Sequence, residues 1–179
     1  MQAASPETMA RARRVDLMIF DVDGVLTDGR LWYGPQGETL KSFHTLDGHG
    51  LKMLQSAGVR VAILSGRTSG AVELRSRELG IEHVLQGIDD KAPAFERLLV
   101  DLALVPEAAG YMGDDVIDLP VLRRCGFACA PAEASELVRT HAHYTAQRPA
   151  GFGAVREVCE LLLQARGALE PALARYLAD

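Results

Sequence analysis

The feature that most constrains the fold of this chain is an alternation of short apolar runs with longer segments of helical spacing. Strands that alternate with helices are typical of a parallel sheet covered by helices on both faces. The sequence therefore predicts an α/β fold, in which ligands bind at the carboxyl ends of the strands. The expected strands lie at residues 15–20, 59–64, 81–85 and 110–112. The expected helices start near Leu51 and continue at 68–79, 91–104, 153–163 and 169–177.

A predicted β-hairpin interrupts this alternation after the first strand. Residues 30–33 and 38–44 have strand character, and residues 34–37 between them are two glycines, a proline and a glutamine. The hairpin region carries side chains of the type found in interface cores, which pack either on the same chain or on another subunit. These side chains are Leu31, Trp32, Tyr33 and Phe43.

Length and composition limit the function classes. With 179 residues, of which 48% are hydrophobic, the chain is long enough for one domain with a sizeable core and too short for two catalytic domains. A net charge of -5 gives no global field that attracts nucleic acid or an anionic membrane. No apolar run approaches a membrane span and residues 1–14 lack the core of a signal peptide, so we expect a cytoplasmic protein. We also expect residues 1–14 to be flexible and residues 167–179 to form a C-terminal tail helix.

Two carboxylates follow the first predicted strand. Asp21 and Asp23 stand two residues apart where the apolar run enters a glycine-containing loop. A carboxylate can attack phosphorus to form an aspartyl-phosphate, and a neighbouring acid can protonate the leaving alkoxide and then deprotonate water. Asp21 suits the first task and Asp23 the second, although two loop aspartates alone could also serve as helix-cap and turn residues.

Two further strand ends carry groups that suit a phosphoryl site. Ser65 and Gly66 follow the second predicted strand, where a hydroxyl and backbone amides can hold phosphoryl oxygens. Lys91 stands at the start of a predicted helix, where the helix dipole disfavours a cation and an electrostatic role in the site explains it better. Taken alone, Ser65 could be a simple N-cap and Lys91 a solvated surface residue.

Three carboxylates cluster after the fourth predicted strand, at Asp114, Asp115 and Asp118. Magnesium prefers oxygen ligands and keeps several waters, so one or two carboxylates and a phosphate oxygen suffice to hold it. We expect Asp114 to be the direct ligand, because it comes first after the strand. Asp115 or Asp118 would then orient the waters bound to the metal without binding the metal directly. The spacing lacks the alternating acids and closing glutamate of a calcium-binding EF-hand.

The order of these motifs along the chain resembles the haloacid dehalogenase (HAD) superfamily. The motifs are DxDGVLT at 21–27, SGR at 65–67, Lys91, and GDDxxD at 113–118. The resemblance implies a Rossmann-like core with all four motifs at strand ends, and the second acid, Asp23, favours phosphate esters over carbon–halogen bonds. Asp21 and Ser65 are 44 positions apart, and Ser65 and Lys91 26, so neither interval has room for a globular cap domain.

Within this superfamily, the chain is similar to the 3-deoxy-D-manno-octulosonate 8-phosphate phosphatases. The hairpin, the missing cap and the segments 43–50 and 153–157 carry this similarity. It implies magnesium-dependent hydrolysis of that eight-carbon sugar-acid phosphate in lipopolysaccharide synthesis. It also implies a homotetramer that associates through the hairpin at residues 29–44, with a neighbouring subunit helping to close each uncapped site.

The same similarity implies a role for each site residue. Asp21 would be nucleophile and metal ligand, Asp23 acid/base and metal ligand through its backbone carbonyl, and Asp114 the remaining protein ligand, with Ser65 and Lys91 in the catalytic group. A cluster of cations in an otherwise acidic chain suits a substrate with a phosphate and a carboxylate. The chain departs from the family at Leu46, where many members carry a basic residue. The implied substrate contacts are Asp23, His44, Thr45, Leu46, Asp47, Gly48, Lys52, Arg67, Arg75 and Lys91.

Three alternatives remain at this point. The first is a phosphatase of another acidic sugar phosphate, such as a nine-carbon sialic-acid type. The second is a receiver-like phosphoacceptor module, which also combines acids, a hydroxyl and a lysine, but places its lysine last in the chain, whereas Lys91 precedes Asp114. The third is a catalytically silent oligomerisation domain, against which the presence of both Asp21 and Asp23 argues.

Overall fold

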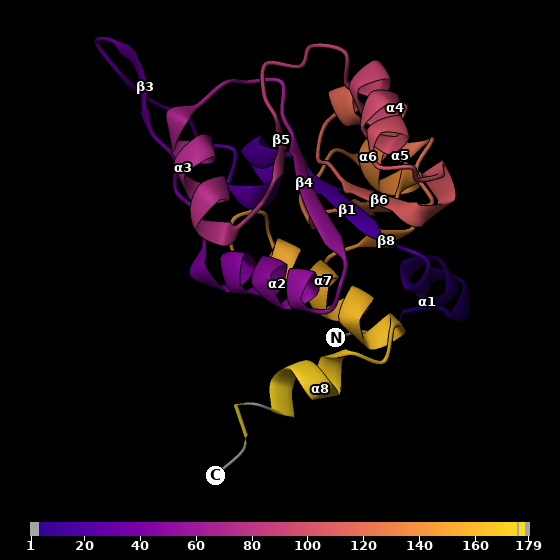
Figure 1. Ribbon diagram of the computed structural model, residues 1–179. Coiled ribbons are helices and arrows are strands. Elements are labelled where there is room, and N and C mark those ends of the chain that lie inside the picture. Colours follow the sequence, from indigo (N-terminus) through magenta and orange to yellow (C-terminus); the bar gives the residue numbers. More distant parts are fainter. Residues whose placement is uncertain (1–3, 175, 178–179) are drawn as a thin grey trace.

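A six-stranded sheet forms the centre of the molecule in the computed structural model, which describes residues 4–174 and 176–177. The strand order is β5-β4-β1-β6-β7-β8, and all neighbouring strands are parallel (Figure 1). The predicted α/β class is confirmed. The strands are β1 (Leu17–Phe20), β4 (Arg60–Leu64), β5 (His83–Leu85), β6 (Ala109–Met112), β7 (Phe127–Ala130) and β8 (Tyr144–Thr145).

Helices cover both faces of this sheet. Successive strand residues point to opposite faces, so Met18 and Phe20 pack in one apolar cluster and Leu17 and Ile19 in the other. The first cluster lies under α1 (Pro6–Arg13), α2 (Thr45–Ser56), α3 (Gly70–Leu79) and α7 (Ala154–Ala165). The second lies under α4 (Lys91–Asp101), α5 (Leu119–Leu122) and α6 (Glu136–His141). No helix in the described part of the chain is long and apolar enough to cross a membrane.

Short turns complete the connections at the two ends of the sheet. At the carboxyl ends lie η1 (Val22–Leu26), directly after β1, and η3 (Val116–Asp118), between β6 and α5; η2 (Pro106–Ala108) precedes β6. Because β1 lies between β4 and β6, the loops after these three strands meet at the centre of one sheet edge. This edge is where the sequence predicted the site.

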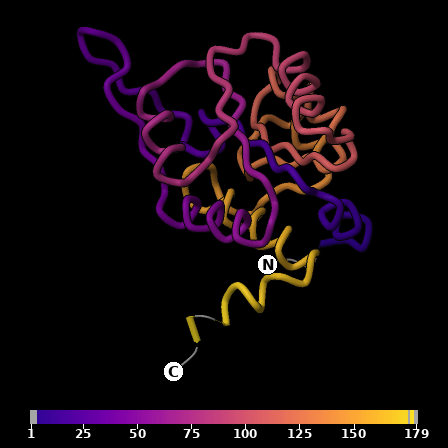
Figure 2. Tube along the Cα trace, in the orientation of Figure 1, coloured from indigo at the N-terminus to yellow at the C-terminus, as the bar shows by residue number. Residues whose placement is uncertain are grey.

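The predicted hairpin is present and stands apart from the sheet. Among the described residues, its strands β2 (Trp32–Gly34) and β3 (Gly37–Leu40) pair only with each other, and Figure 2 shows the hairpin projecting from the body of the molecule. The turn uses Gly37 at a φ of 109°, which favours glycine. The strands are shorter than predicted, since residues 41–44 lie outside β3.

The two ends of the chain differ from expectation. Within the segment expected to be flexible, Pro6–Arg13 form helix α1, which Ser5 caps by accepting a hydrogen bond from the Thr8 N–H at 3.1 Å and which packs against α7. Residues 1–3 lie outside the described residues. The expected tail helix is shorter than predicted: α8 covers Leu169–Ala174 and extends away from the sheet in Figure 2, while residues 175 and 178–179 lie outside the described part.

Candidate active site

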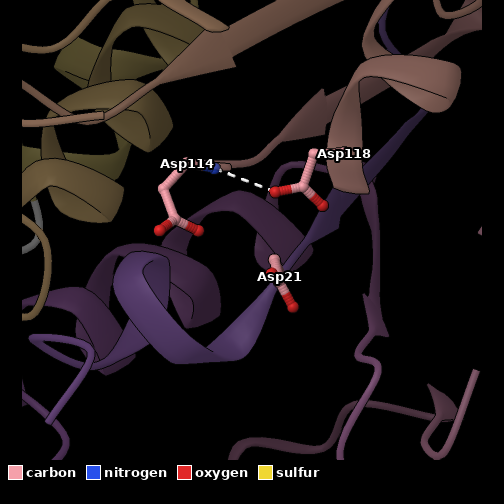
Figure 3. A group of neighbouring side chains, drawn as sticks. All are labelled: Asp21, Asp114 and Asp118. Atoms are coloured by element: carbon pink, nitrogen blue, oxygen red, sulfur yellow. Dashed lines mark hydrogen bonds between the residues drawn. The ribbon is translucent and has the colours of Figure 1, made fainter. Parts of the chain in front are cut away.

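Three carboxylates meet at the carboxyl ends of β1 and β6. The Asp21 N–H continues the pairing of these strands by donating to the Met112 carbonyl oxygen at 3.0 Å, which places Asp21 beside the loop that carries Asp114. One carboxylate oxygen each from Asp21, Asp114 and Asp118 lies within 4.8 Å of the others (Figure 3). The two acidic motifs, more than 90 positions apart in sequence, therefore form one cluster.

A glycine allows this close approach. Gly24 has a φ of 85°, and a Cβ atom there would overlap the Asp114 carboxylate. Any other residue would strain the η1 turn and displace Asp114, so the glycine of the DxDG motif has a steric role.

Asp118 holds the cluster together through four hydrogen bonds that its two carboxylate oxygens accept. It is fully buried, and its Oδ1 accepts hydrogen bonds from Lys91 Nζ and from the Tyr111 hydroxyl, each at 2.6 Å. Its Oδ2 accepts from the backbone N–H groups of Asp114 at 3.0 Å and Asp115 at 3.2 Å (Figure 3 shows the first). Since both oxygens already have two donors, Asp118 fits an orienting role better than a direct metal bond.

Lys91 is the cation inside this cluster. Its side chain is buried, and Nζ lies 3.0 Å from Asp21 Oδ2 and 2.6 Å from Asp118 Oδ1. Burial opposes the charge, yet Asp21 and Asp118 outweigh it and raise the pKa of Lys91 above its ordinary value. Lys91 is therefore a paired internal ammonium, and not the solvated surface residue that its sequence position also allowed.

The cluster carries more negative than positive charge. Burial, and then repulsion from Asp118, raise the pKa of Asp21 to about 6 and that of Asp114 to about 8. A divalent cation relieves this repulsion and favours oxygen ligands. Asp21 and Asp114, whose oxygens are less engaged than those of Asp118, would hold such an ion.

Asp23 lies in a second group of charges beside the cluster. Its Oδ1 forms an ion pair with Lys41 Nζ, and its Oδ2 lies 3.5 Å from Arg67 Nε. Arg67 also donates hydrogen bonds to Glu38 at 2.8 Å and to the Tyr33 hydroxyl at 2.9 Å. Lys41 and Glu38 are not among the predicted site residues, because they meet Asp23 and Arg67 only when the hairpin folds back onto the sheet edge.

Ser65 lies at the same edge of the sheet. It follows β4, whose Ile63 is in register with Phe20 of β1, and it is 2% exposed. Its Oγ accepts a hydrogen bond from the Arg67 N–H at 3.4 Å, and its own N–H donates to the Leu85 carbonyl at 2.9 Å. The expected strand-end position of Ser65 agrees with the structure.

The remaining predicted substrate contacts lie on and around α2 and α3, where His44, Asp47, Gly48 and Arg75 line a pocket that Leu26 of η1 also borders. Asp47 is buried and accepts hydrogen bonds from the N–H groups of Gly153 at 3.3 Å and Arg156 at 2.8 Å, so it caps the start of α7, a role the sequence did not reveal. The Arg75 guanidinium packs over Gly48. Within the described residues, no hydrogen bond or ion pair links this group to Asp21 or Asp114. Its members are His44, Thr45, Leu46, Asp47, Gly48, Lys52 and Arg75.

Comparison with known proteins identifies the class and then the family. A structure described as a HAD superfamily (subfamily III A) hydrolase from Legionella pneumophila superposes with a TM-score of 0.91 at 40% identity, covering 97% of this chain and 95% of that one. The parallel sheet with paired acids after its central strand is thus that of a HAD hydrolase. No protein-family model matches the chain.

A curated relative shows the family. The 3-deoxy-D-manno-octulosonate 8-phosphate phosphatase KdsC of Salmonella typhimurium is 45% identical over 168 residues, which cover 94% of this chain and 89% of the relative. The chain belongs to the family of 3-deoxy-D-manno-octulosonate 8-phosphate phosphatases. The member from Moraxella catarrhalis, whose structure is a complex with magnesium ion, phosphate ion and the sugar acid KDO, superposes with a TM-score of 0.93 at 38% identity, covering 95% of this chain and 98% of that one.

Proposed function

We propose that this chain hydrolyses 3-deoxy-D-manno-octulosonate 8-phosphate to the free sugar acid and phosphate, with Mg²⁺ as cofactor and a phosphorylated Asp21 as intermediate. The observation that carries the proposal is the group of Asp21, Asp114 and Lys91 at the carboxyl edge of the sheet, in which Asp21 and Lys91 are buried and paired. The magnesium, phosphate and sugar acid bound by the Moraxella relative agree with it.

In the first step, one Asp21 carboxylate oxygen attacks the phosphorus as the bond to the sugar oxygen breaks. Asp23 gives its proton to that sugar oxygen, so the product leaves as an alcohol. Lys91, 3.0 Å from Asp21, and the hydroxyl of Ser65 stabilise the charge on the phosphoryl oxygens.

In the second step, water attacks the phosphorus of the aspartyl-phosphate and the bond to Asp21 breaks. Asp23 takes the proton from that water and returns to the state in which the cycle began. Asp21, Asp114 and the backbone carbonyl of Asp23 would hold Mg²⁺, which would supply positive charge that neutralises the phosphoryl group. Asp118, with both oxygens engaged, keeps Lys91 and the Asp114 loop in place.

Recognition of the sugar part is assigned to the predicted cations and to the start of α2. We assign the substrate phosphate and carboxylate to Arg67, Arg75, Lys52 and Lys91, because arginine and lysine supply charge-assisted hydrogen bonds to such groups. We assign residues 44–48, which have no hydrogen bond or ion pair with Asp21 or Asp114 among the described residues, to contacts with a substrate bound at a neighbouring subunit. Leu46, 43% exposed, provides no charged contact there.

A homotetramer built through the hairpin at 29–44 is part of the proposal. Trp32 is 51% and Tyr33 62% exposed, and apolar surface of this kind is buried most effectively by another chain. A cytoplasmic location and a role in lipopolysaccharide synthesis complete the proposal.

The test is a phosphate-release assay with the purified chain, with and without Mg²⁺. Eight-carbon and nine-carbon sugar-acid phosphates serve as substrates. We expect magnesium-dependent release with preference for the eight-carbon ester. A preference for the nine-carbon ester would transfer the assignment to a sialic-acid-type substrate, and no release from either would refute it.

A further inference from the structure

The base of the hairpin reaches into the active site through Lys41. This residue follows β3, and its side chain is only 1% exposed although it carries a charge. Its Nζ contacts Asp23 Oδ1 and lies 3.2 Å from Glu38 Oε2. A buried ammonium is costly unless carboxylates surround it, so both contacts are needed to keep Lys41 inside.

Glu38 completes a closed set of charges around this lysine. Its Oε2 also accepts a hydrogen bond from Arg67 at 2.8 Å, and its Oε1 accepts one from the Ser69 hydroxyl at 2.8 Å. Two cations, Lys41 and Arg67, thus face two anions, Asp23 and Glu38. The set joins the hairpin to the loops after β1 and β4, the two strands that supply Asp21 and Ser65.

The two carboxylate oxygens of Asp23 have different contacts. Oδ1 is held by Lys41, whereas Oδ2 is buried without a hydrogen bond and lies 3.5 Å from Arg67 Nε, which also has none. A carboxylate that transfers a proton needs one oxygen free for the substrate and must be held in a fixed orientation. The contacts of Asp23 hold Oδ1 in place and leave Oδ2 without a hydrogen bond, so that Oδ2 is the oxygen left to exchange a proton.

We propose that Lys41 is a positioning residue of the phosphatase reaction, which fixes Asp23 through Oδ1 so that Oδ2 exchanges the proton with the substrate. The inference rests on the proposed function. In the first step the Oδ2–H bond breaks and the proton passes to the sugar oxygen as its bond to phosphorus breaks. In the second step Oδ2 takes a proton from water as the new oxygen–phosphorus bond forms and Asp21 is released. Lys41 keeps its charge throughout.

Two substrates with different leaving groups can distinguish this positioning role from a role in which Lys41 only anchors the hairpin. The sugar alkoxide needs a proton to depart, whereas p-nitrophenolate, a weak base, leaves without one. A misplaced Asp23 should therefore slow phosphorylation of Asp21 by the sugar phosphate and spare phosphorylation by p-nitrophenyl phosphate. A loosened hairpin that disturbs the whole site would slow both.

The experiment compares Lys41→Met with the wild type on both substrates in the presence of Mg²⁺. For the sugar phosphate we expect kcat to fall about 100-fold or more, with KM changed less than about threefold. With enzyme in excess over p-nitrophenyl phosphate, the first-turnover release of p-nitrophenolate should stay within about threefold of the wild type. Lys41→Arg, which keeps the cation, should recover at least about tenfold of the lost kcat.

The control is Arg97→Met, which removes a cation of α4 whose side chain is 84% exposed and 4.0 Å from Asp101. It should leave both reactions unchanged. Lys41→Gln replaces Lys41→Met if the latter fails to give a cooperative melt. Equal loss on both substrates, a change in KM alone, or an unchanged kcat would each overturn the role of Lys41. Failure of the wild type to release phosphate would instead refute the proposed function.

Discussion

The strand-end cluster and the hairpin differ in how far their side chains are buried and bonded within the chain. In the cluster, Asp118 and Lys91 are buried and hydrogen-bonded to groups of the same chain. In the hairpin, Trp32 and Leu40 are about half exposed, and the two strands pair only with each other. An isolated two-stranded hairpin is at best marginally stable in water. The strand-end cluster is therefore completed within one chain, whereas the exposed apolar side chains of the hairpin are available for another surface to cover.

For the strand-end cluster, the substitution with the largest expected effect is Asp21→Asn. A neutral amide is a poor nucleophile and a poor metal ligand, so kcat should fall on the order of 10⁴-fold or more. The fold and the oligomer should persist, because the amide can still accept the hydrogen bond from the Val22 N–H. Phosphate release and size-exclusion chromatography measure the two effects, and Asp28→Asn is the control. Activity within tenfold of the wild type would contradict nucleophilic catalysis by Asp21.

Lys91→Met tests whether the cluster is also structural. The substitution leaves Asp21, Asp118 and the Tyr111 hydroxyl buried without their cation. Breaking a buried pair on one side costs about 3–5 kcal/mol, and we expect the free energy of unfolding in urea to fall by this order, together with a loss of activity. Arg97→Met, at an exposed helix position, should change it by less than about 0.5 kcal/mol. Equal stabilities of the two variants would show that the cluster adds nothing to the fold.

The pH dependence of magnesium binding tests the excess negative charge of the cluster. The pKa values of Asp21, about 6, and Asp114, about 8, lie above the ordinary value of 3.8, so the folded state binds these protons more tightly than the unfolded state. Without metal, their contribution to the free energy of unfolding therefore decreases as pH rises from the ordinary value through the folded values.

Magnesium competes with these protons, so its stabilising effect should change in the opposite direction. The increase in Tm caused by Mg²⁺ should grow between about pH 5.5 and pH 8.5. Asp114→Asn should abolish most of this increase. An effect of Mg²⁺ that is the same at both pH values, or that survives in Asp114→Asn, would place the ion elsewhere.

Trp32→Ser tests whether another chain covers the hairpin, and it should have the smallest effect on the fold. Because the side chain is half exposed in one chain, its loss should change the free energy of unfolding of the separated subunit by less than about 0.5 kcal/mol. In the assembly the same change should shift the oligomer toward smaller species in analytical ultracentrifugation. Val100→Ser, 78% exposed on α4, is the control. An unchanged assembly would exclude Trp32 from the subunit interface.

Sequence patterns predicted the parts of the molecule that depend on local order. Asp21, Ser65 and Asp114 each follow a strand, and parallel strands necessarily bring such positions to one edge. The early hairpin was recognisable from the turn-forming residues between two apolar runs. The alternation also gave the α/β class, but it missed both β7, at Phe127–Ala130, and β8, which has only two residues and pairs with β7 through its backbone.

Contacts between distant segments could not be predicted in this way. Lys41 reaches Asp23 only because the chain returns from the hairpin, and the buried Tyr111 hydroxyl lies in a strand whose neighbours are apolar. Asp47 caps a helix that begins more than 100 residues later. In each case the side chain's partner is set by tertiary packing, and no spacing along the chain encodes it.

The most direct test of the account is to trap the phosphorylated enzyme during turnover of 3-deoxy-D-manno-octulosonate 8-phosphate. Borohydride reduces an aspartyl-phosphate to homoserine, which tandem mass spectrometry can locate in the tryptic peptide 15–30. This peptide contains four aspartates, at positions 16, 21, 23 and 28, and fragmentation distinguishes between them. We predict homoserine at position 21, formed only with substrate and absent from Asp21→Asn. Reduction at position 16, 23 or 28, or full turnover with no reducible intermediate, would contradict nucleophilic catalysis by Asp21.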